Sequence, residues 1–210
     1  MSREFTTGLV LAAGGSKRLG QPKQLLPYGS ATLLEHVLST ARACSFDQLV
    51  CVVGGGADEI ETRVNFAGVQ VVENDYFGEG CSSSIAAARS AVDARCQVLV
   101  LMLGDQPGVR AATVAKLLAG RGQAALAACA YDNGRGHPLA FARSTFDQLA
   151  SLHGDKGVWS CLIAPAMPWS MFRSAERSPA TLTPGRTTKP RWPTRPDQRV
   201  EATLISSAAP

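Results

Sequence analysis

Apolar residues gather in short runs along the first 150 residues of the chain, and several of these runs end at glycine. The runs predict buried strands at residues 8–11, 48–53, 69–73, 98–103, 124–131 and 138–141. Helical spacing of apolar positions predicts helices at 33–43, 58–64, 83–92, 111–118 and 144–152. Thr32 and Glu35 have the spacing of a capping box before the first helix. The alternation predicts an α/β fold with a mainly parallel sheet covered on both faces.

The composition is that of a soluble globular domain, because 45% of the 210 residues are hydrophobic and 18% are charged. No apolar run approaches the ~18 residues of a membrane span. The first residues lack the pattern of a signal peptide. Six cysteines show no C-x-x-C spacing, which favours reduced thiols over a zinc site. We therefore expect a cytoplasmic protein with no membrane partner.

Charge and proline are distributed unevenly along the chain. Residues 1–158 hold 14 basic and 14 acidic residues with 4 prolines, whereas residues 159–210 hold 7 basic and 3 acidic residues with 8 prolines. The net charge of +4 therefore belongs to the C-terminal quarter, and it is too small to indicate nucleic-acid binding by itself. We predict one domain at 1–158 and an atypical, poorly ordered Pro- and Arg-rich tail at 159–210.

The first segment that carries chemistry follows the strand at 8–11. It reads L-A-A-G-G-S-K-R-L-G-Q-P-K from Leu11 to Lys23. Small residues let a backbone approach a ligand closely, and exposed N–H groups can cradle phosphate. Lys17, Arg18 and Lys23 add positive charge suited to a triphosphate. The segment matches neither the P-loop nor the dinucleotide fingerprint, which disfavours a dehydrogenase. A purely structural glycine turn is the alternative.

Asp105 is the second residue with a chemical signal, because it directly follows the apolar strand at 98–103. Packing gives no reason for a carboxylate there. Mg²⁺ binds in proteins through one or two carboxylates together with phosphate oxygens. Ligands in such sheets bind beyond the carboxyl ends of the strands, so we expect Asp105 to face the loop after Leu11 and to hold Mg²⁺. A turn-initiating aspartate before Pro107 is the alternative.

Four segments together resemble the nucleotidyltransferases of the molybdenum-cofactor type. They are L-A-A-G-G-S-x-R-L-G-x-P-K-x-L-L from residue 11, N-D-Y-F-G-E-G-C-S-S-S at 74–84, L-G-D-Q-P at 103–107, and G-H-P at 136–138 with G-D-K-G at 154–157. The resemblance covers roughly residues 7–158, and Ala12-Ala13 is more like the CTP-using members than the GTP-using ones. It implies a Rossmann-like three-layer α/β/α fold, as in nucleotide-diphospho-sugar transferases.

The resemblance also implies roles for individual residues. The nucleotide would lie against Leu11, Ala12, Ala13, Gly14, Gly15, Ser16, Arg18 and Lys23, with Asn74 and Ser82 near the base. Arg18, Lys23 and Asp105 would be catalytic, with the two cations on phosphate and Asp105 on Mg²⁺. His137, Asp155 and Lys156 would meet the acceptor. The alternatives are helix N-capping by one of the serines at 82–84 and turn positions for the last three.

The reaction implied by the resemblance is transfer of CMP from CTP to a molybdopterin-type molybdenum cofactor, with release of pyrophosphate. The acceptor phosphate is itself the nucleophile, so catalysis would rest on positioning and on charge neutralisation at the α-phosphorus. GTP as the donor, or a sugar phosphate as the acceptor, is an alternative within this class. A non-catalytic accessory protein that binds nucleotide or cofactor for a molybdenum enzyme is the alternative of another class.

The tail lacks the acidic stretch, similar to D-x-D-T-x-E-D-Y-E-A-L, with which members of the resembled family usually end. Residues 179–193 read P-A-T-L-T-P-G-R-T-T-K-P-R-W-P, and their possible codons, read from the third base, permit G-D-A-D-T-W-E-D-Y-E-A-A-L-A. We therefore hypothesise a frame change near residues 159–160, in the gene or in its sequencing. A natural Pro-rich disordered tail, or a basic tail that touches nucleic acid, is the alternative.

Reading the nucleotides of the gene tests the frame change. We expect the bases that encode residues 179–193 to encode the acidic stretch in the shifted frame. Any other shifted translation leaves a native Pro-rich tail and refutes the hypothesis. A chain with the altered frame lacks one metal ligand and a terminal helix, so its turnover should be lower than that of the in-frame chain.

Overall fold

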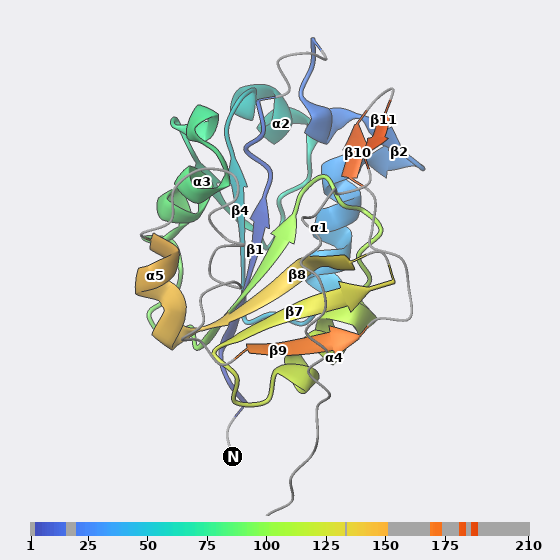
Figure 1. Ribbon diagram of the computed structural model, residues 1–210. Coiled ribbons are helices and arrows are strands. Elements are labelled where there is room, and N and C mark those ends of the chain that lie inside the picture. The colour runs from blue at the N-terminus through green and yellow to red at the C-terminus, as the bar shows by residue number, and fades with distance from the viewer. Residues whose placement is uncertain are drawn as a thin grey trace, which may run out of the picture.

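A computed structural model describes residues 3–15, 20–132 and 134–150, together with the backbone of three short strands beyond residue 168. Its centre is a seven-stranded sheet (Figure 1). In spatial order the strands are β5 (Gln70–Glu73), β4 (Gln48–Val53), β1 (Thr6–Leu11), β6 (Val98–Leu103), β8 (Gly134–Ala142), β7 (Leu126–Tyr131) and β9 (Trp169–Arg173). All neighbours pair in parallel except β8, which is antiparallel to both β6 and β7.

Helices cover both faces of the sheet. One face packs against α1 (Leu33–Ala43), α2 (Ala57–Arg63) and α4 (Ala111–Arg121), and the other against α3 (Cys81–Ala88) and α5 (Phe146–Ala150). Successive side chains of a strand point to opposite faces of the sheet. Val10 of β1 packs in the core beneath α1, α2 and α4, while Leu9 and Leu11 pack in the core beneath α3 and α5. The fold is thus the predicted three-layer α/β/α arrangement. Within the described part of the chain, no helix combines the length and the apolar character that crossing a membrane requires.

The longest periodic segments agree best with the sequence-based prediction. The bounds of α1, β4 and β6 are those predicted, and the capping box of α1 is confirmed. The Thr32 hydroxyl accepts the Glu35 N–H at 3.2 Å, while the Glu35 carboxylate accepts the Thr32 N–H at 2.9 Å. Strands β1, β5 and β7 and helices α2 and α4 differ from the prediction by one to three residues at one or both ends, because helix and strand ends lack periodic signal.

Three elements differ more from the prediction. The helix expected at 83–92 is α3, which starts two residues earlier, directly after Gly80 with φ +98°, and ends four residues earlier, at Ala88. The strand expected at 138–141 is the nine-residue β8, because it pairs with β6 on one side and β7 on the other. The helix expected at 144–152 begins as the 3-10 helix η3 (Arg143–Thr145) and continues as α5.

The remaining elements are too short for a periodic signal. They are the 3-10 helices η1 (Lys23–Leu25) and η2 (Phe77–Glu79), the hairpin of β2 (Pro27–Tyr28) with β3 (Ala31–Thr32), and the hairpin of β10 (Thr181–Thr183) with β11 (Arg186–Thr188). Strand β9 lies in the segment predicted as a tail and pairs in parallel with β7, so the main sheet includes backbone from beyond residue 158. The domain boundary and the frame change stay predictions.

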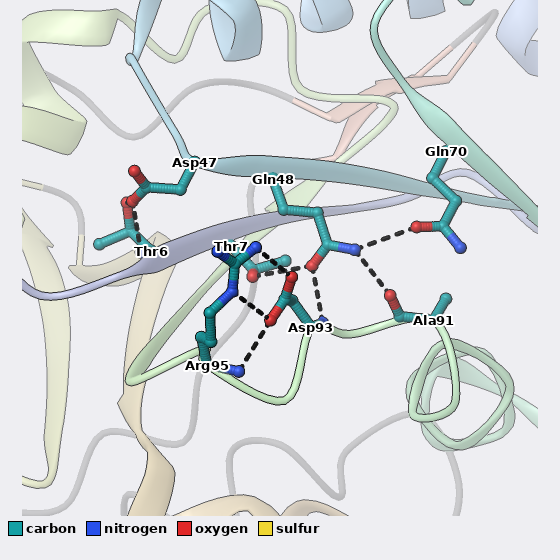
Figure 2. A network of polar contacts seen from close by, with 8 residues as sticks. All are labelled: Thr6, Thr7, Asp47, Gln48, Gln70, Ala91, Asp93 and Arg95. Atoms are coloured by element: carbon teal, nitrogen blue, oxygen red, sulfur yellow. Dashed lines mark hydrogen bonds and ion pairs between the residues drawn. The ribbon is translucent and has the colours of Figure 1, made fainter.

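Gln48, the first residue of β4, ties the amino edge of the sheet together (Figure 2). Its Oε1 accepts the Thr7 hydroxyl at 3.0 Å and the Asp93 N–H at 2.9 Å. Its Nε2 donates to Gln70 Oε1 at 3.0 Å and to the Ala91 carbonyl at 2.7 Å. One amide thus joins β1, β4, β5 and the segment between α3 and β6.

Two carboxylates beside Gln48 are held in their charged form (Figure 2). Asp47 accepts the Thr6 N–H at 2.8 Å, and this hydrogen bond keeps the pKa of Asp47 below its usual value. Hydrogen bonds from Arg95 lower the pKa of Asp93 to about 2. Because both pKa values are depressed in the folded protein, their contribution to stability is present at neutral pH and is lost as the pH falls through them.

Replacing Gln48 with Met keeps the length of the side chain but removes all four hydrogen bonds. Two donors and two acceptors then lose their partner, so we expect the free energy of unfolding to fall by about 2–3 kcal/mol. Urea denaturation measures this as a lower midpoint at an unchanged slope. Gln70→Met is the matched control, because it removes one exposed bond and should cost at most about 0.5 kcal/mol. Equal losses in the two variants would contradict a central role for Gln48.

Candidate active site

The carboxyl ends of three parallel strands meet at the edge of the sheet opposite Gln48. Leu11 at the end of β1 is paired with Val52 of β4 and with Leu103 of β6. Beyond the strands, the Ala12 N–H donates to the Val52 carbonyl at 2.8 Å, and the Gly104 N–H donates to the Leu11 carbonyl at 2.8 Å. The loop after β1 and the loop after β6 are therefore hydrogen-bonded side by side, as the sequence led us to expect.

Glycines let these loops touch. A Cβ on Gly104 would lie 2.8 Å from Ala12 Cβ, and a Cβ on Gly54 would lie 2.9 Å from the Ala13 carbonyl oxygen. A Cβ on Gly55 would lie 2.9 Å from Gly15 Cα. In the sequence, the glycines at 54–56 indicate only where the apolar run at 48–53 ends. The structure gives them a second role, because they make room for the loop after β1.

Asp105 and Lys23 come together at this edge. Asp105 follows β6 and Lys23 begins η1, and the Lys23 ammonium donates to Asp105 Oδ2 at 2.8 Å. Both side chains keep contact with solvent, with 16% of the Lys23 side chain and 32% of the Asp105 side chain exposed. The motifs assign Lys23 to phosphate and Asp105 to metal. They give no signal for the ion pair, because 82 positions separate the partners.

Asn74 lies at the same edge but uses its side chain within the protein. Its N–H donates to the Val53 carbonyl at the end of β4, and only 2% of the residue is exposed. Its Nδ2 donates to the hydroxyls of Ser83 and Ser84, both at 3.0 Å, while its Oδ1 accepts the Tyr76 N–H at 3.0 Å. Asn74 therefore shapes the loop between β5 and α3 rather than presenting its amide to solvent.

Ser82, the other residue predicted near the base, is buried in the first turn of α3. The N-cap of this helix is Gly80, which has no capping side chain. The Ser83 hydroxyl lies 2.8 Å from the Gly80 carbonyl oxygen and 2.9 Å from that of Tyr76. Ser83 and Ser84 thus bind Asn74 and stabilise the loop, which sequence reasoning did not anticipate. Contact of Asn74 and Ser82 with a base stays a prediction.

His137 is buried on β8, two residues before Leu139, which pairs with Leu101 of β6. It therefore lies toward the end of the sheet where β6 ends. Burial lowers the pKa of His137 to about 4, so the imidazole is neutral at pH 7. The Tyr131 hydroxyl donates to the His137 carbonyl at 2.6 Å and holds this part of β8 against β7. A neutral imidazole can exchange hydrogen bonds with an acceptor but supplies no positive charge.

The remaining predicted residues divide into two groups. Leu11, Ala12 and Ala13 are buried, Gly15 is half-buried and Gly14 is exposed. Four predicted residues, Ser16, Arg18, Asp155 and Lys156, lie outside the described part of the chain. Their roles stay predictions.

The donor set at this edge fits a magnesium ion that arrives with a nucleotide. Within the described residues, no group of three His, Cys, Asp or Glu side chains forms a closed metal cage. Asp105 offers a partly exposed carboxylate at the mouth of the loop after β1. Mg²⁺ is usually held by one or two carboxylates while phosphate oxygens and waters complete its shell. Among the predicted site residues that the structure describes, Asp105 is therefore the side chain that could hold it.

Loops packed at the carboxyl edge of a parallel sheet, with a lysine and an aspartate between them, define a nucleotide-binding α/β protein of the nucleotidyltransferase class. Residues 8–168 match the model of the MobA-like NTP transferase domain. The chain belongs to this family, as its motifs predicted.

Individual relatives resemble this chain over most of its length. A homologue of Mycobacterium tuberculosis Rv0371c from Mycobacterium sp. strain JC1 is 48% identical, with a TM-score of 0.82 over 86% of this chain and 91% of that one. Rv0371c of M. tuberculosis H37Rv in complex with manganese is 38% identical, with a TM-score of 0.74 over 84% and 92%. Nicotine blue oxidoreductase of Paenarthrobacter nicotinovorans is 34% identical over 72% of this chain and 78% of its own length.

Replacing Gly55 with Ala tests the close contact of the loops. The new methyl group would lie 2.9 Å from backbone at Gly15 and 3.0 Å from the Phe77 ring, so the loops must separate. We expect the free energy of unfolding to fall by about 1–3 kcal/mol, measured by thermal or urea denaturation. Gly78→Ala, on η2, is the matched control, since nothing lies within 4 Å of its added Cβ. A Gly55→Ala variant as stable as Gly78→Ala would show that the loops are not in tight contact.

Proposed function

We propose that this protein transfers CMP from CTP to a phosphorylated, molybdopterin-type acceptor in the cytoplasm and releases pyrophosphate. The observation that carries this proposal is the Lys23–Asp105 pair, which lies where the loops after β1 and β6 meet. The Lys23 ammonium and the Asp105 carboxylate lie 2.8 Å apart. In a metal–triphosphate complex, the ammonium suits the phosphate oxygens and the carboxylate suits the metal ion. A molybdenum enzyme that receives the product is the implied partner.

The reaction needs no protein nucleophile, because an acceptor phosphate oxygen attacks the α-phosphorus and pyrophosphate leaves. Lys23 donates its ammonium hydrogens to phosphate oxygens and neutralises charge that builds up on the leaving group. Asp105 would hold Mg²⁺, which would supply positive charge to neutralise the phosphate oxygens. In the proposal Arg18 adds a second cation on the phosphates, while Leu11–Ser16 accommodate the nucleotide with Asn74 and Ser82 near its base.

The acceptor would lie on the β8 side of the aspartate. His137 takes part there as a neutral hydrogen-bonding group, because burial keeps its pKa near 4. Asp155 and Lys156 are proposed as further contacts to the acceptor. CTP is favoured over GTP as the donor because of the double alanine Ala12-Ala13, while GTP or a sugar phosphate remains an alternative substrate within the class.

A specific observation favours a second candidate function. The relative from P. nicotinovorans carries the name of an oxidoreductase and matches 72% of this chain. The loop after β1 lacks the dinucleotide fingerprint, which weighs against a nicotinamide cofactor. Oxidation of a reduced nicotinamide in the presence of a dye acceptor would establish this second function.

A nucleotide-binding protein without catalytic activity is the alternative of another class. Its melting temperature would rise with nucleotide, but it would release no pyrophosphate.

The assay of pyrophosphate release with a molybdopterin-type acceptor tests the proposed function. We expect release with Mg²⁺ and CTP, more slowly with GTP or ATP, and a rate at least ~100-fold lower for Asp105→Asn and for Lys23→Met. Mg²⁺ with CTP should also raise the melting temperature by mass action. Asp147→Asn is the matched control, because that aspartate is 94% exposed and lies on α5, which follows the end of β8 that pairs with the start of β6. Full activity of Asp105→Asn would refute the assigned role.

A further inference from the structure

Gln24 follows Lys23 in η1 and turns its side chain to the loop after β1. Only 5% of the residue is exposed, and Leu25 after it enters the core. The Gln24 amide donates from Nε2 to the Ala12 carbonyl and, at 3.2 Å, to the Gly14 carbonyl. One buried side chain thus holds two alternate carbonyls of the predicted nucleotide loop on the same side.

The planar peptide bond fixes the direction of the N–H group that follows each of these two carbonyls. In a trans peptide, the C=O of one residue and the N–H of the next point in opposite directions. When the carbonyls of Ala12 and Gly14 face Gln24, the N–H groups of Ala13 and Gly15 face away from it. Neither N–H donates a hydrogen bond within the part of the chain that the structure describes. The N–H groups of Ala13 and Gly15 therefore both point to the side of the loop that faces away from the Gln24 amide.

We propose that Gln24 is a positioning residue that presents the N–H groups of Ala13 and Gly15 to acceptor oxygens of the bound nucleotide. Successive N–H groups that point the same way form a concave site for phosphate or carbonyl oxygens. The neighbouring Lys23 reaches the Asp105 carboxylate, so η1 fixes the loop and the cation together. This inference rests on the proposed function for the identity of the ligand, and it adds a residue to which the motifs assigned no role.

A purely structural role for Gln24 makes a different prediction. If the amide served only to satisfy two carbonyls, its loss would lower stability and leave ligand affinity unchanged below the melting temperature. A positioning role requires that affinity fall even when stability is matched. Leu25→Ala is the control that lowers stability without touching the loop. Leu25 is buried in the same 3-10 helix, but its side chain packs in the core.

The test compares Gln24→Met with Leu25→Ala by isothermal titration calorimetry, at a temperature where both variants are folded. The probes are inorganic pyrophosphate, which offers phosphate oxygens, and cytidine, which offers base and ribose oxygens. We expect Gln24→Met to weaken at least one probe 10-fold or more, while Leu25→Ala stays within twofold of the wild type. The probe that weakens identifies the oxygens that the two N–H groups meet. Binding of both probes within twofold for Gln24→Met, or no binding by the wild type, overturns the inference.

Two further readouts separate positioning from loss of structure. The ¹⁵N-amide resonances of Ala13 and Gly15 should shift in ligand-free Gln24→Met and stay in place in Leu25→Ala. In Gln24→Glu, the new carboxylate repels the two carbonyls, whereas its protonated form can donate one hydrogen bond. Its affinity relative to the wild type should therefore recover as the pH falls, and a constant ratio would count against the inference. Because the probes are not turned over, a failed pyrophosphate-release assay refutes the proposed function without deciding the role of Gln24.

Discussion

The close approach of backbone at the carboxyl edge of the sheet is the constraint on which the rest of the structure depends. Leu11 lies between Val52 and Leu103 in the ladder, and the loops that follow continue this contact through N–H to carbonyl bonds. Side chains at Gly104 or Gly55 would push the loops apart. With the loops in contact, Asp105 comes within reach of Lys23, and a lysine and a carboxylate from distant segments share one site.

The sequence was sufficient for the elements whose own residues determine them. The apolar run of β6 predicts a strand buried on both faces, and Thr32 with Glu35 predicts the start of α1, because these signals are local. The position of Asp105 at a strand end was also enough to place it opposite the loop after β1. The inference about Asp105 needed only the rule that carboxyl ends of parallel strands share an edge.

The rest depended on side-chain contacts between loops and short helices, which leave no periodic pattern. The amide of Asn74 is bound to the hydroxyls of Ser83 and Ser84, nine and ten residues further along the chain. The ion pair of Lys23 and the contacts of Gln24 depend on how η1 packs beside β1. A three-residue helix has no periodicity to detect, so neither contact could be predicted from spacing.

The place of β8 in the sheet has a consequence for how the chain folds. β7 precedes β8 along the chain, yet β8 lies between β7 and β6 and runs against both. During synthesis, the edge of β6 that pairs with β8 therefore stays unpaired until residues 134–142 have been made. Until then β7 has no strand to pair with on that side, and two apolar strands stay exposed to wrong partners. The half of the sheet that carries His137 is therefore joined to the parallel half through the pairing of β8 with β6.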